Sequence, residues 1–584
     1  MKINLRFCCL IGFFMMIQNC FSQGAAWVSG LKATGGANDL SGYRMCQGQA
    51  MAMDSLGNVY VTGYFTNRSI VFGSFTLNNA DTTGSVNDVF IVKFDDNNNV
   101  VWAKSVGMAG KSEIGYGIAV DVNGNVLVTG QFKDTITFDA ITITGLGNSS
   151  VFTVKYDQNG NALWAKSVYG NVASVGSAGG QGRAIATDGN GDVYITGFFL
   201  SESFYFGTDT TIVSSPSGYI DHDADFFIAK YNSSGHFIWA RSAGGSSATN
   251  PLAAMNDQGL SITMGNAGNI YAAGQFACAK MIFESDTLAN FVTGNTDVFV
   301  VNYNAANGSV IWAKKGGGYY NENLTGISSD HSGNAIITGY SNSYNYFFDA
   351  DTLYKKGYTG GFVVKYNSNG NVVWAKDIGY FSSDIKVRSV YADANDNVSV
   401  LGTFYDRIVF AGDTIKSGDL FVFSYDNMGN EAWELSTGVG AAYSNAIVGN
   451  GTDMYVSGGF TGVGTISAVL KFNNSLLPCP GPSPAMDFFL GRISTSALGI
   501  KDIQDFNHVI TIKPNPSNGI FSITTASEIK TVEVLNVFGQ QVYLAGVSGK
   551  MAQVDLSKEA TGIYYVMITD HDNKSTVKKI MVCK

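Results

Sequence analysis

The sequence predicts an all-β protein: a seven-bladed β-propeller closed by an N-terminal strand, followed by a small C-terminal β-sandwich. Three observations lead to this fold. Strand-like phrases recur along most of the chain, four of them make up each unit, and no segment keeps a helical period of 3.6 residues. A twisted four-stranded unit cannot bury both of its faces alone, so the units must stack on one another.

Each unit contains the same strands in the same order. The first strand ends in Asp, as at residues 117–121 and 184–188, and a Gly/Asn turn leads into a second strand such as GNVYVTGYF at 57–65. A variable link follows, and then a third strand such as DVFIVKF at 88–94. Period-2 alternation, β-branched and aromatic residues and Asn-Gly turns together predict antiparallel hairpins.

Tryptophan marks the fourth strand of the unit. The third strand has seven copies, the last being DFFLGRI at 487–493, and no Trp strand follows that copy. Trp27 stands alone near the start of the chain. We therefore expect Trp27 to be the missing copy, residues 25–31 to pair with 487–493, and the ends of the propeller to be joined by this pairing. The other six tryptophans are Trp102, Trp164, Trp239, Trp312, Trp374 and Trp433.

The repeat resembles the bacterial SBBP-type β-propeller repeat family. The phrases that carry this resemblance are GNVYVTG, DVFIVKF and WAKSVG, and they cover about residues 24–494. The Gly-His and Trp-Asp signature of WD40 repeats is absent. The resemblance implies a propeller in an exported protein, and it implies no particular reaction.

The first residues read as a signal peptide, residues 1–22. Lys2 and Arg6 supply its positive charge, and an apolar run follows at residues 10–17. That run is too short to span a bilayer, and no later segment approaches the necessary length. The sequence therefore predicts export and no transmembrane segment.

A second domain is predicted at residues 507–584, after a polar linker at 494–506. The ordered motifs Pro-Asn-Pro, Gly-x-Phe, Val-x-Asn-x-x-Gly, Gly-Ile-Tyr-Tyr and a late Lys-Lys resemble the type A sorting domain of the type IX secretion system. The resemblance implies the type IX machinery as partner, then removal of this domain and release or attachment at the cell surface. Its motif residues here are Pro514, Asn515, Pro516, Gly519, Phe521, Gly539, Gly562, Tyr564, Lys578 and Lys579.

Composition and motifs argue against several chemistries. The formal net charge is −10 with no basic block, which argues against nucleic acid as a partner. The five His are scattered, and no HExxH or CxxC pair occurs. We therefore expect no enzyme activity and no cofactor. One calcium alternative stays open at the turn containing Asp188, Asn190 and Asp192, although it lacks the spacing and closing Glu of a calcium loop, and a structural turn is favoured.

A repeated Asp-Ser/Thr phrase, followed by an aliphatic residue or Thr, resembles a bacterial O-glycosylation sequon. The alternative, which the sequence slightly favours, is that these phrases simply belong to the repeated link. The candidate acceptors are Thr82, Thr135, Thr210, Thr287, Thr352 and Thr414.

Ligand binding is expected on the longer loops between strands. Tyr319, Tyr320 and Asn321 lie in one such loop, which is rich in the Tyr, Asn and Gly typical of recognition loops. The predicted function is a non-enzymatic, exported propeller that binds a protein or a glycan at the cell surface. The alternatives are a polysaccharide lyase or glycoside hydrolase on a propeller scaffold, and a structural adhesion or surface-layer component.

Overall fold

The computed structural model describes residues 25–583 apart from 36–44, 172–178, 202, 208–209, 214–223, 246–255, 267, 356, 380–383, 406, 411–412, 417–419, 438–440, 462–468, 473–474, 479–485, 496–509, 537–540 and 572–574. The predicted signal peptide, most of the predicted linker and Gly539 lie outside the described residues. The chain divides into two compact units, Met1–Ser496 and Ala497–Lys584. Their described residues contain strands and turns and no helix.

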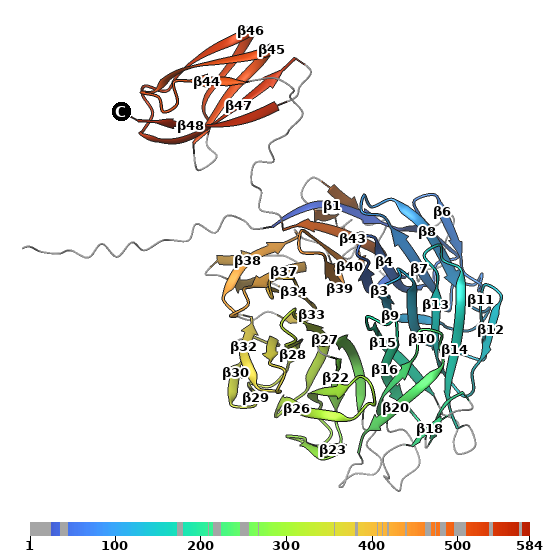
Figure 1. Ribbon diagram of the computed structural model, residues 1–584. Helices are drawn as coiled ribbons and strands as arrows, with labels where there is room; N and C mark the ends of the chain where they lie inside the picture. Colours follow the sequence, from blue (N-terminus) through green and yellow to red (C-terminus); the bar gives the residue numbers. More distant parts are fainter. Residues whose placement is uncertain are drawn as a thin grey trace, which may run out of the picture. The chain divides into compact units, whose positions relative to one another are not determined.

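In the described residues of the first unit, seven antiparallel sheets share a core of four strands; five contain these four strands alone, and two are extended to six strands by a neighbouring hairpin (Figure 1). Sheet one contains β3 (Cys46–Met53), β4 (Val59–Phe65), β7 (Asp88–Phe94) and β8 (Val100–Val106); sheet two contains β9 (Ile114–Val120), β10 (Val126–Phe132), β13 (Ser150–Tyr156) and β14 (Ala162–Gly170); sheet three contains β15 (Gly180–Thr187), β16 (Val193–Phe199), β19 (Asp225–Tyr231) and β20 (Phe237–Ala243). Sheet four contains β21 (Gln258–Met264), β22 (Asn269–Phe276), β25 (Asp297–Asn304) and β26 (Val310–Gly318); sheet five contains β27 (Glu322–Ser329), β28 (Ala335–Ser341), β31 (Gly360–Tyr366) and β32 (Val372–Ile378). Sheet six contains β33 (Ile385–Ala392), β34 (Val398–Phe404), β37 (Leu420–Tyr425) and β38 (Glu431–Ser436); sheet seven contains β39 (Ala441–Gly449), β40 (Asp453–Thr461), β43 (Met486–Ser494) and β1 (Ala26–Lys32).

The sheets stack face to face in a propeller-like arrangement. Every residue of the third strands β7, β13 and β19 is buried, so both faces of these strands are covered by protein. The first strands contact one another from sheet to sheet: β3 contacts β9, and the series continues through β15, β21, β27 and β33 to β39, which contacts β3. The first strand of sheet one, β3, therefore lies beside the first strand of sheet seven, β39.

The N-terminal strand β1 pairs antiparallel with β43, as the stray tryptophan predicts. The prediction that Trp27 itself occupies the place of the other tryptophans is wrong. Trp102 lies opposite Lys93, and the residue of sheet seven that corresponds to Lys93 is Arg492, which lies opposite Ser29. The register is thus shifted by two residues, and Trp27 takes the place that Val100 has in sheet one.

Burial supports this register. Val28 is 48% exposed, and the residue that corresponds to it in sheet one, Val101, is 46% exposed. Trp27 is buried in a cluster with Phe489 and Ile493, and its Nε1 donates to Ser436 O at 3.2 Å. The phrase alignment missed this shift because a tryptophan at either position gives the same apolar pattern.

The link after each second strand forms a two-stranded hairpin, which the sequence predicts only as a variable connection. Apolar side chains alternate along these hairpins, and residues such as Ile70 and Phe72 are buried against the sheets. Two of the hairpins also pair with the fourth strand of the preceding sheet, β17 with β14 and β29 with β26, and β5 pairs with the short strand β2 (Thr34–Gly35) that follows β1. The hairpins are β5–β6 (Ser69–Phe72, Phe75–Asn78), β11–β12 (Thr135–Phe138, Ile141–Thr144), β17–β18 (Ser203–Phe206, Thr210–Val213), β23–β24 (Lys280–Phe283, Asp286–Ala289), β29–β30 (Asn345–Phe348, Asp351–Tyr354), β35–β36 (Arg407–Phe410, Asp413–Lys416) and β41–β42 (Val469–Phe472, Ser475–Pro478).

The second unit is a single hydrogen-bonded sheet of five strands around its own apolar core. Its strands are β44 (Thr511–Lys513), β45 (Ile520–Asn536), β46 (Gln541–Asp555), β47 (Gly562–Asp570) and β48 (Ser575–Val582). Register shifts between Thr524 and Ile529 divide β45, and its first part pairs with β44 whereas its second part pairs with β47. Side chains from both parts, including Phe521 and Val534, fill one core. The two expected layers are therefore joined by long shared strands.

Candidate functional site

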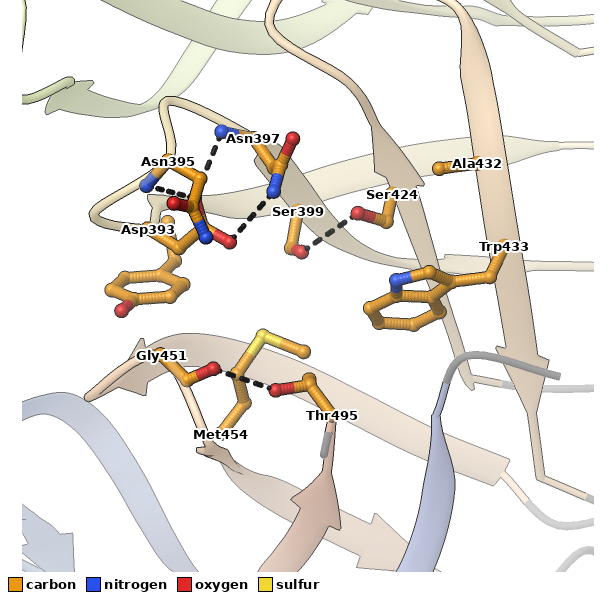
Figure 2. Close-up of a pocket in the computed structure, with 11 residues that line it drawn as sticks. Asp393, Asn395, Asn397, Ser399, Ser424, Ala432, Trp433, Gly451, Met454 and Thr495 are labelled. Carbon is orange, nitrogen blue, oxygen red and sulfur yellow. Dashed lines mark hydrogen bonds between the residues drawn. The ribbon is translucent and has the colours of Figure 1, made fainter. Parts of the chain in front are cut away.

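A polar pocket of about 250 Å³ opens between sheets six and seven (Figure 2). Sheet six supplies the turn after β33 and residues of β34, β37 and β38, and sheet seven supplies the turn before β40 and the end of β43. We call it the seam pocket, since it borders the sheet that joins the two ends of the unit. Its lining residues are Tyr391, Asp393, Asn395, Asn397, Ser399, Ser424, Ala432, Trp433, Gly451, Met454 and Thr495.

In sheets one to five the corresponding place is closed by a hairpin turn. The fourth-strand indole of one sheet donates its Nε1 hydrogen to the turn that joins the third and fourth strands of the next sheet. Trp102 donates to Gln158 O at 3.1 Å, and Trp312 donates to Ser368 O at 2.8 Å. The same bond recurs for Trp164, Trp239 and Trp374, with acceptors Ser233, Ala305 and Asn427.

Sheet seven cannot supply such a turn to Trp433. Its third strand, β43, and its fourth strand, β1, come from opposite ends of the unit, so no hairpin turn connects them. Among the described residues, the Nε1 of Trp433 has no hydrogen-bond partner, and the side chain is only half-buried. Figure 2 shows the indole extending toward Ser424 and Met454, with Asp393 across the pocket.

Two small residues deepen the pocket. Ser399 on β34 lies opposite Ser424 on β37, and their hydroxyl oxygens are 3.4 Å apart. The corresponding pairs in sheets one and three are large, Tyr60 with Lys93 and Tyr194 with Lys230. Sheet six thus lacks both bulky side chains that fill this position elsewhere.

Asp393 supplies the charge of the pocket. Its Oδ1 accepts hydrogen bonds from the backbone N–H groups of Asn395 and Asn397, both at 2.9 Å, and its Oδ2 accepts one from Asn397 Nδ2 at 2.9 Å. Burial and the Asp393 carboxylate raise the pKa of Tyr391 to about 12, so this phenol remains a neutral hydrogen-bond donor. The pocket therefore combines an aromatic ring, amides, hydroxyls and one carboxylate.

The calcium candidates form a hydrogen-bonded turn beside a lysine. The backbone N–H groups of Asn190 and Asp192 donate to Asp188 Oδ1 at 2.9 and 3.0 Å. Lys230 Nζ lies 2.9 Å from Asp192 and 3.9 Å from Asp188, so an ammonium already faces both carboxylates. No group of three or more His, Cys, Asp or Glu suited to a metal occurs among the described residues. This geometry favours the structural alternative for the turn.

The predicted recognition loop connects β26 to β27. Tyr319 and Tyr320 are exposed, at 69% and 53%, and Asn321 is exposed as well. Asn321 Oδ1 accepts a hydrogen bond from Thr296 N at 3.0 Å, which fixes the loop against the neighbouring connection. Two adjacent exposed rings suit a contact surface, and ligand binding there stays a prediction.

The glycosylation candidates fall largely on the outer hairpins. Thr82 and Thr287 are exposed, whereas Thr135 and Thr352 are half-buried. Thr210 begins β18 and Thr414 lies in β36, and the side chains of these two residues are outside the described set. Their regular placement matches the repeated-link alternative and leaves Thr82 and Thr287 accessible to a transferase.

The sorting motif is built into the second unit. Asn515 Oδ1 accepts a hydrogen bond from Met581 N at 2.9 Å, and Asn515 Nδ2 donates to Lys579 O at 3.0 Å, so the segment containing Pro514 and Pro516 is held against β48. Gly519 has a φ of +108°, and a Cβ there would meet the backbone of Ser557.

The remaining described motif residues divide between core and surface. Phe521 and Tyr564 are buried, and the Tyr564 hydroxyl donates to Ala560 O at 2.7 Å. Gly562 begins β47, Lys578 is half-buried and Lys579 is exposed on β48. The motif thus mainly specifies the fold of the second unit, with Lys579 presented to solvent.

The seam pocket was missed by reasoning from the sequence, although its signal is present there. The second strand of sheet six reads DNVSVLG, with Ser399 where GNVYVTG has Tyr60. Its third strand reads DLFVFSY, with Ser424 where DVFIVKF has Lys93. Each difference looks like ordinary divergence of a repeat, because only the strand pairing shows that the two serines face each other.

Residues 511–583 match the model of the secretion system C-terminal sorting domain. This match confirms type IX sorting for the C-terminal unit. The protein is therefore delivered by type IX secretion to the cell surface or the extracellular space. In the part of the chain that the structure describes, no helix is long and apolar enough to cross a membrane.

The chain is also similar to two curated proteins. An uncharacterized WD repeat-containing protein of Acanthamoeba polyphaga mimivirus is 23% identical over 527 residues, which are 75% of this chain and 36% of that protein. The regulatory protein FlaEY of Caulobacter vibrioides is 27% identical over 185 residues, which are 32% of this chain and 17% of that protein. The chain thus spans 36% of the length of the first relative and 17% of the length of the second.

Similar solved structures include PorZ of Porphyromonas gingivalis, described as a surface component of the type IX secretion system. It has a TM-score of 0.19 and 9% identity, and the match covers 94% of this chain and 100% of that one. The extracellular region of plexin A4 has a TM-score of 0.36 and 7% identity, with 92% and 67% covered.

Proposed function

We propose that this exported protein is a closed seven-bladed β-propeller of the SBBP repeat type, and that it binds glycans in the seam pocket without turning them over. The scaffold is the propeller, the site is the seam pocket, and the ligand class is a glycan. The observation that carries the proposal concerns Trp433. In five other sheets the corresponding tryptophan is covered by a turn and donates a hydrogen bond to it, whereas Trp433 lines the seam pocket.

The contacts between sheets support a closed ring. A repeat array that is open has two free ends, whereas here β39 contacts β3 and β1 pairs with β43. Arg492 supports the same reading, since its Nη1 donates to Asp96 O at 3.1 Å. Asp96 lies in the third-to-fourth-strand turn of sheet one, so this bond replaces the indole bond at the junction of sheets seven and one.

The side chains of the seam pocket suit a sugar. A pyranose ring presents apolar C–H groups on its face and hydroxyls around its edge, and it therefore pairs with an aromatic ring and with polar groups beside it. Trp433 supplies the ring together with an unused N–H donor. Asn395, Asn397 and Ser424 supply amide and hydroxyl groups.

The acids of the pocket favour binding over hydrolysis. A glycosidase of the usual kind needs two carboxyl groups on opposite sides of the scissile bond. Among the described residues that line the seam pocket, Asp393 is the only Asp or Glu. A lone carboxylate orients a ligand, and it does not supply both an acid and a base.

Glycan-array screening of the purified full chain, followed by calorimetry on the hits, tests this function. We expect Trp433→Ala to weaken binding by at least tenfold, because the aromatic contact is lost. Ser399→Tyr keeps the wall of the pocket and restores the tyrosine of sheet one, and it should block binding by filling the space. The paired variant Tyr319→Ala/Tyr320→Ala tests the β26–β27 loop as the alternative site, and if the seam pocket is the glycan site this variant should bind as the parent does.

Three results would refute the proposal. The first is unchanged glycan binding by both pocket variants in folded protein. The second is loss of binding only in the Tyr319→Ala/Tyr320→Ala variant, which would move the site to the β26–β27 loop. The third is release of shortened or unsaturated sugars from any bound glycan, which would show an enzyme instead.

A further inference from the structure

We infer that the inner end of the seam pocket holds a primary ammonium group, so that the glycan recognised there is an amino sugar with a free amine. This inference rests on the proposed glycan-binding function and narrows its ligand class. It comes from one repeated position of the sheets, where sheets one, two, three and five carry a lysine: Lys93, Lys155, Lys230 and Lys365.

In three sheets a buried lysine neutralises an acid beside the first turn. Lys155 Nζ lies 2.8 Å from Asp121 in sheet two, and Lys365 Nζ lies 2.6 Å from Asp330 in sheet five. In sheet three the acid at this position is Asp188; Lys230 Nζ lies 3.9 Å from Asp188 and 2.9 Å from Asp192 in the same turn. These ammonium groups also donate to the turn carbonyls that the indoles use, at Ser233, Ala305 and Asn427.

Sheet four lacks both charges. Gly265 stands where sheets two, three and five have the acid, and Asn302 stands where those sheets have the lysine. The acid and the cation have therefore disappeared together in that sheet. This agrees with the cost of leaving a partly buried charge without a partner.

Of the sheets that keep the acid, sheet six alone lacks the lysine; sheet one keeps Asp54 and Lys93, and sheet seven has Asn450 and Arg492 at these places. Sheet six keeps the acid, Asp393, and replaces the lysine by Ser424. Among the described residues no Lys, Arg or His nitrogen lies within ion-pair distance of Asp393, and its Oδ2 accepts one hydrogen bond, from Asn397. A carboxylate oxygen has room for a second donor. The place of the missing ammonium is open to the pocket.

An ammonium group at this place would gain several contacts at once. Asp393 offers a charge-assisted hydrogen bond, and the hydroxyls of Ser399 and Ser424 lie where the larger side chains of sheet three are. In sheet three, Lys230 Nζ lies 4.9 Å from the ring centroid of Tyr194. In sheet six, the rings that line the same space are Tyr391 and Trp433.

The shape of the pocket favours an amino sugar over the lysine side chain of a protein partner. The lysine side chain of a protein partner would need only the narrow space that the side chain of Lys155 or Lys365 occupies in its own sheet. The seam pocket is wider, because sheet six lacks the tyrosine as well and sheet seven lacks the hairpin turn. A sugar ring fills this additional space beside Trp433 while its amine reaches Asp393.

Calorimetry with two matched ligands tests the inference on the full chain: a β-1,4-linked glucosamine trimer and its fully N-acetylated counterpart. We expect the free-amine trimer to bind at least tenfold more tightly to the parent protein, because acetylation removes the charge. Asp393→Asn should abolish this preference and keep the weaker binding that depends on Trp433. Ser424→Lys should supply an internal ammonium and suppress binding of the amine trimer.

Asp426→Asn removes the same charge from the other turn of sheet six, outside the pocket, and is the matched control. It should keep the preference for the amine. Equal binding of the two trimers would overturn the inference, and the proposed glycan function would stand if Trp433→Ala still weakened both. A preference that survives Asp393→Asn would also overturn it. Binding of lysine-rich peptides with neither trimer bound would overturn the inference and the glycan function together.

Discussion

At the scale of single residues, each sheet repeats the same polar positions, and the residue type at each position differs from sheet to sheet. An Asp or Asn at the start of a hairpin turn accepts backbone N–H groups, as Asp393 and Asp426 both do. Most of these side chains complete their own turn. Asp393 and Asp426 make the same three hydrogen bonds, and Asp393 differs in that it lines the seam pocket, where we expect function.

Buried acids at the ends of the strands that lie away from the seam pocket make the stability of the protein depend on pH. Burial raises the pKa of Glu113 to about 7, with the charge of Asp88 adding to the effect, and burial raises the pKa of Asp88 to about 6. Glu322 behaves alike, with a pKa of about 7. An unfolded glutamate titrates near 4.3. Between about pH 4.3 and pH 7 the folded state therefore binds more protons than the unfolded state.

We expect the free energy of unfolding to fall as the pH rises from about 4.5 to about 7, since protons that stabilise the folded state are lost. Glu113→Gln should flatten this slope by up to one proton, about 1.4 kcal/mol per pH unit. Denaturant titrations of the purified chain at four pH values across this range measure it. Parallel curves for parent and Glu113→Gln would contradict the assignment.

Asp426→Asn is the control for this experiment. Although burial raises the pKa of Asp426, hydrogen bonds from Asn430 and Met428 hold it below its usual range. Its contribution to stability is lost only as the pH falls below the range tested. The variant should therefore keep the slope of the parent between pH 4.5 and pH 7.

At the scale of elements, β1 determines how sheet seven is completed. Its pairing covers β43, and Trp27 packs against Phe489 and Ile493 in the core between sheets six and seven. The same arrangement creates the seam pocket, because a fourth strand that arrives from the other end of the unit brings no turn with it.

Replacing Trp27 tests the contribution of this strand. Trp27→Ala should lower the free energy of unfolding by about 3 kcal/mol, since a buried tryptophan leaves a large cavity. Val28→Ser, a change at the next residue on the exposed side of the strand, should shift it by less than about 0.5 kcal/mol. Chemical denaturation followed by tryptophan fluorescence and far-ultraviolet circular dichroism compares them. Equal effects would show that β1 is not packed as described.

At the scale of the whole molecule, export and the proposed glycan binding belong to different units. The sorting unit has its own core, which includes Phe521, Val534 and Tyr564, and it matches the secretion family on its own. The candidate site lies wholly in the first unit. Each task should therefore be removable without the other.

A chain that lacks residues 507–584 should accumulate in the periplasm, because the secretion machinery would no longer recognise it. Cell fractionation with an antibody against the first unit measures its location. Trp433→Ala is the control, and we expect it to reach the surface or the medium at the level of the parent. Surface exposure of the truncated chain would contradict the division of tasks.

The strands and their order could be predicted from the sequence because they depend on local patterns. Alternation in DVFIVKF and the Asn-Gly turns are visible within a few residues, and the solitary Trp27 was enough to predict that β1 pairs with β43. The PNP and GIYY motifs identified the sorting unit for a similar reason, since they lie in a fixed order over a short distance. The outer hairpins were not predicted, because strands of four residues are too short to show a clear alternation of apolar and polar residues.

The register of β1 and the existence of the seam pocket were decided only by the tertiary structure. A shift of two residues preserves which side chains face the core, so the sequence pattern of residues 25–31 fits Trp27 and Ser29 equally well at the tryptophan position. The pocket requires Ser399, Ser424, Asp393 and Trp433 to meet beside a missing turn. Those residues come from three strands and one turn, and only pairing and stacking bring them together.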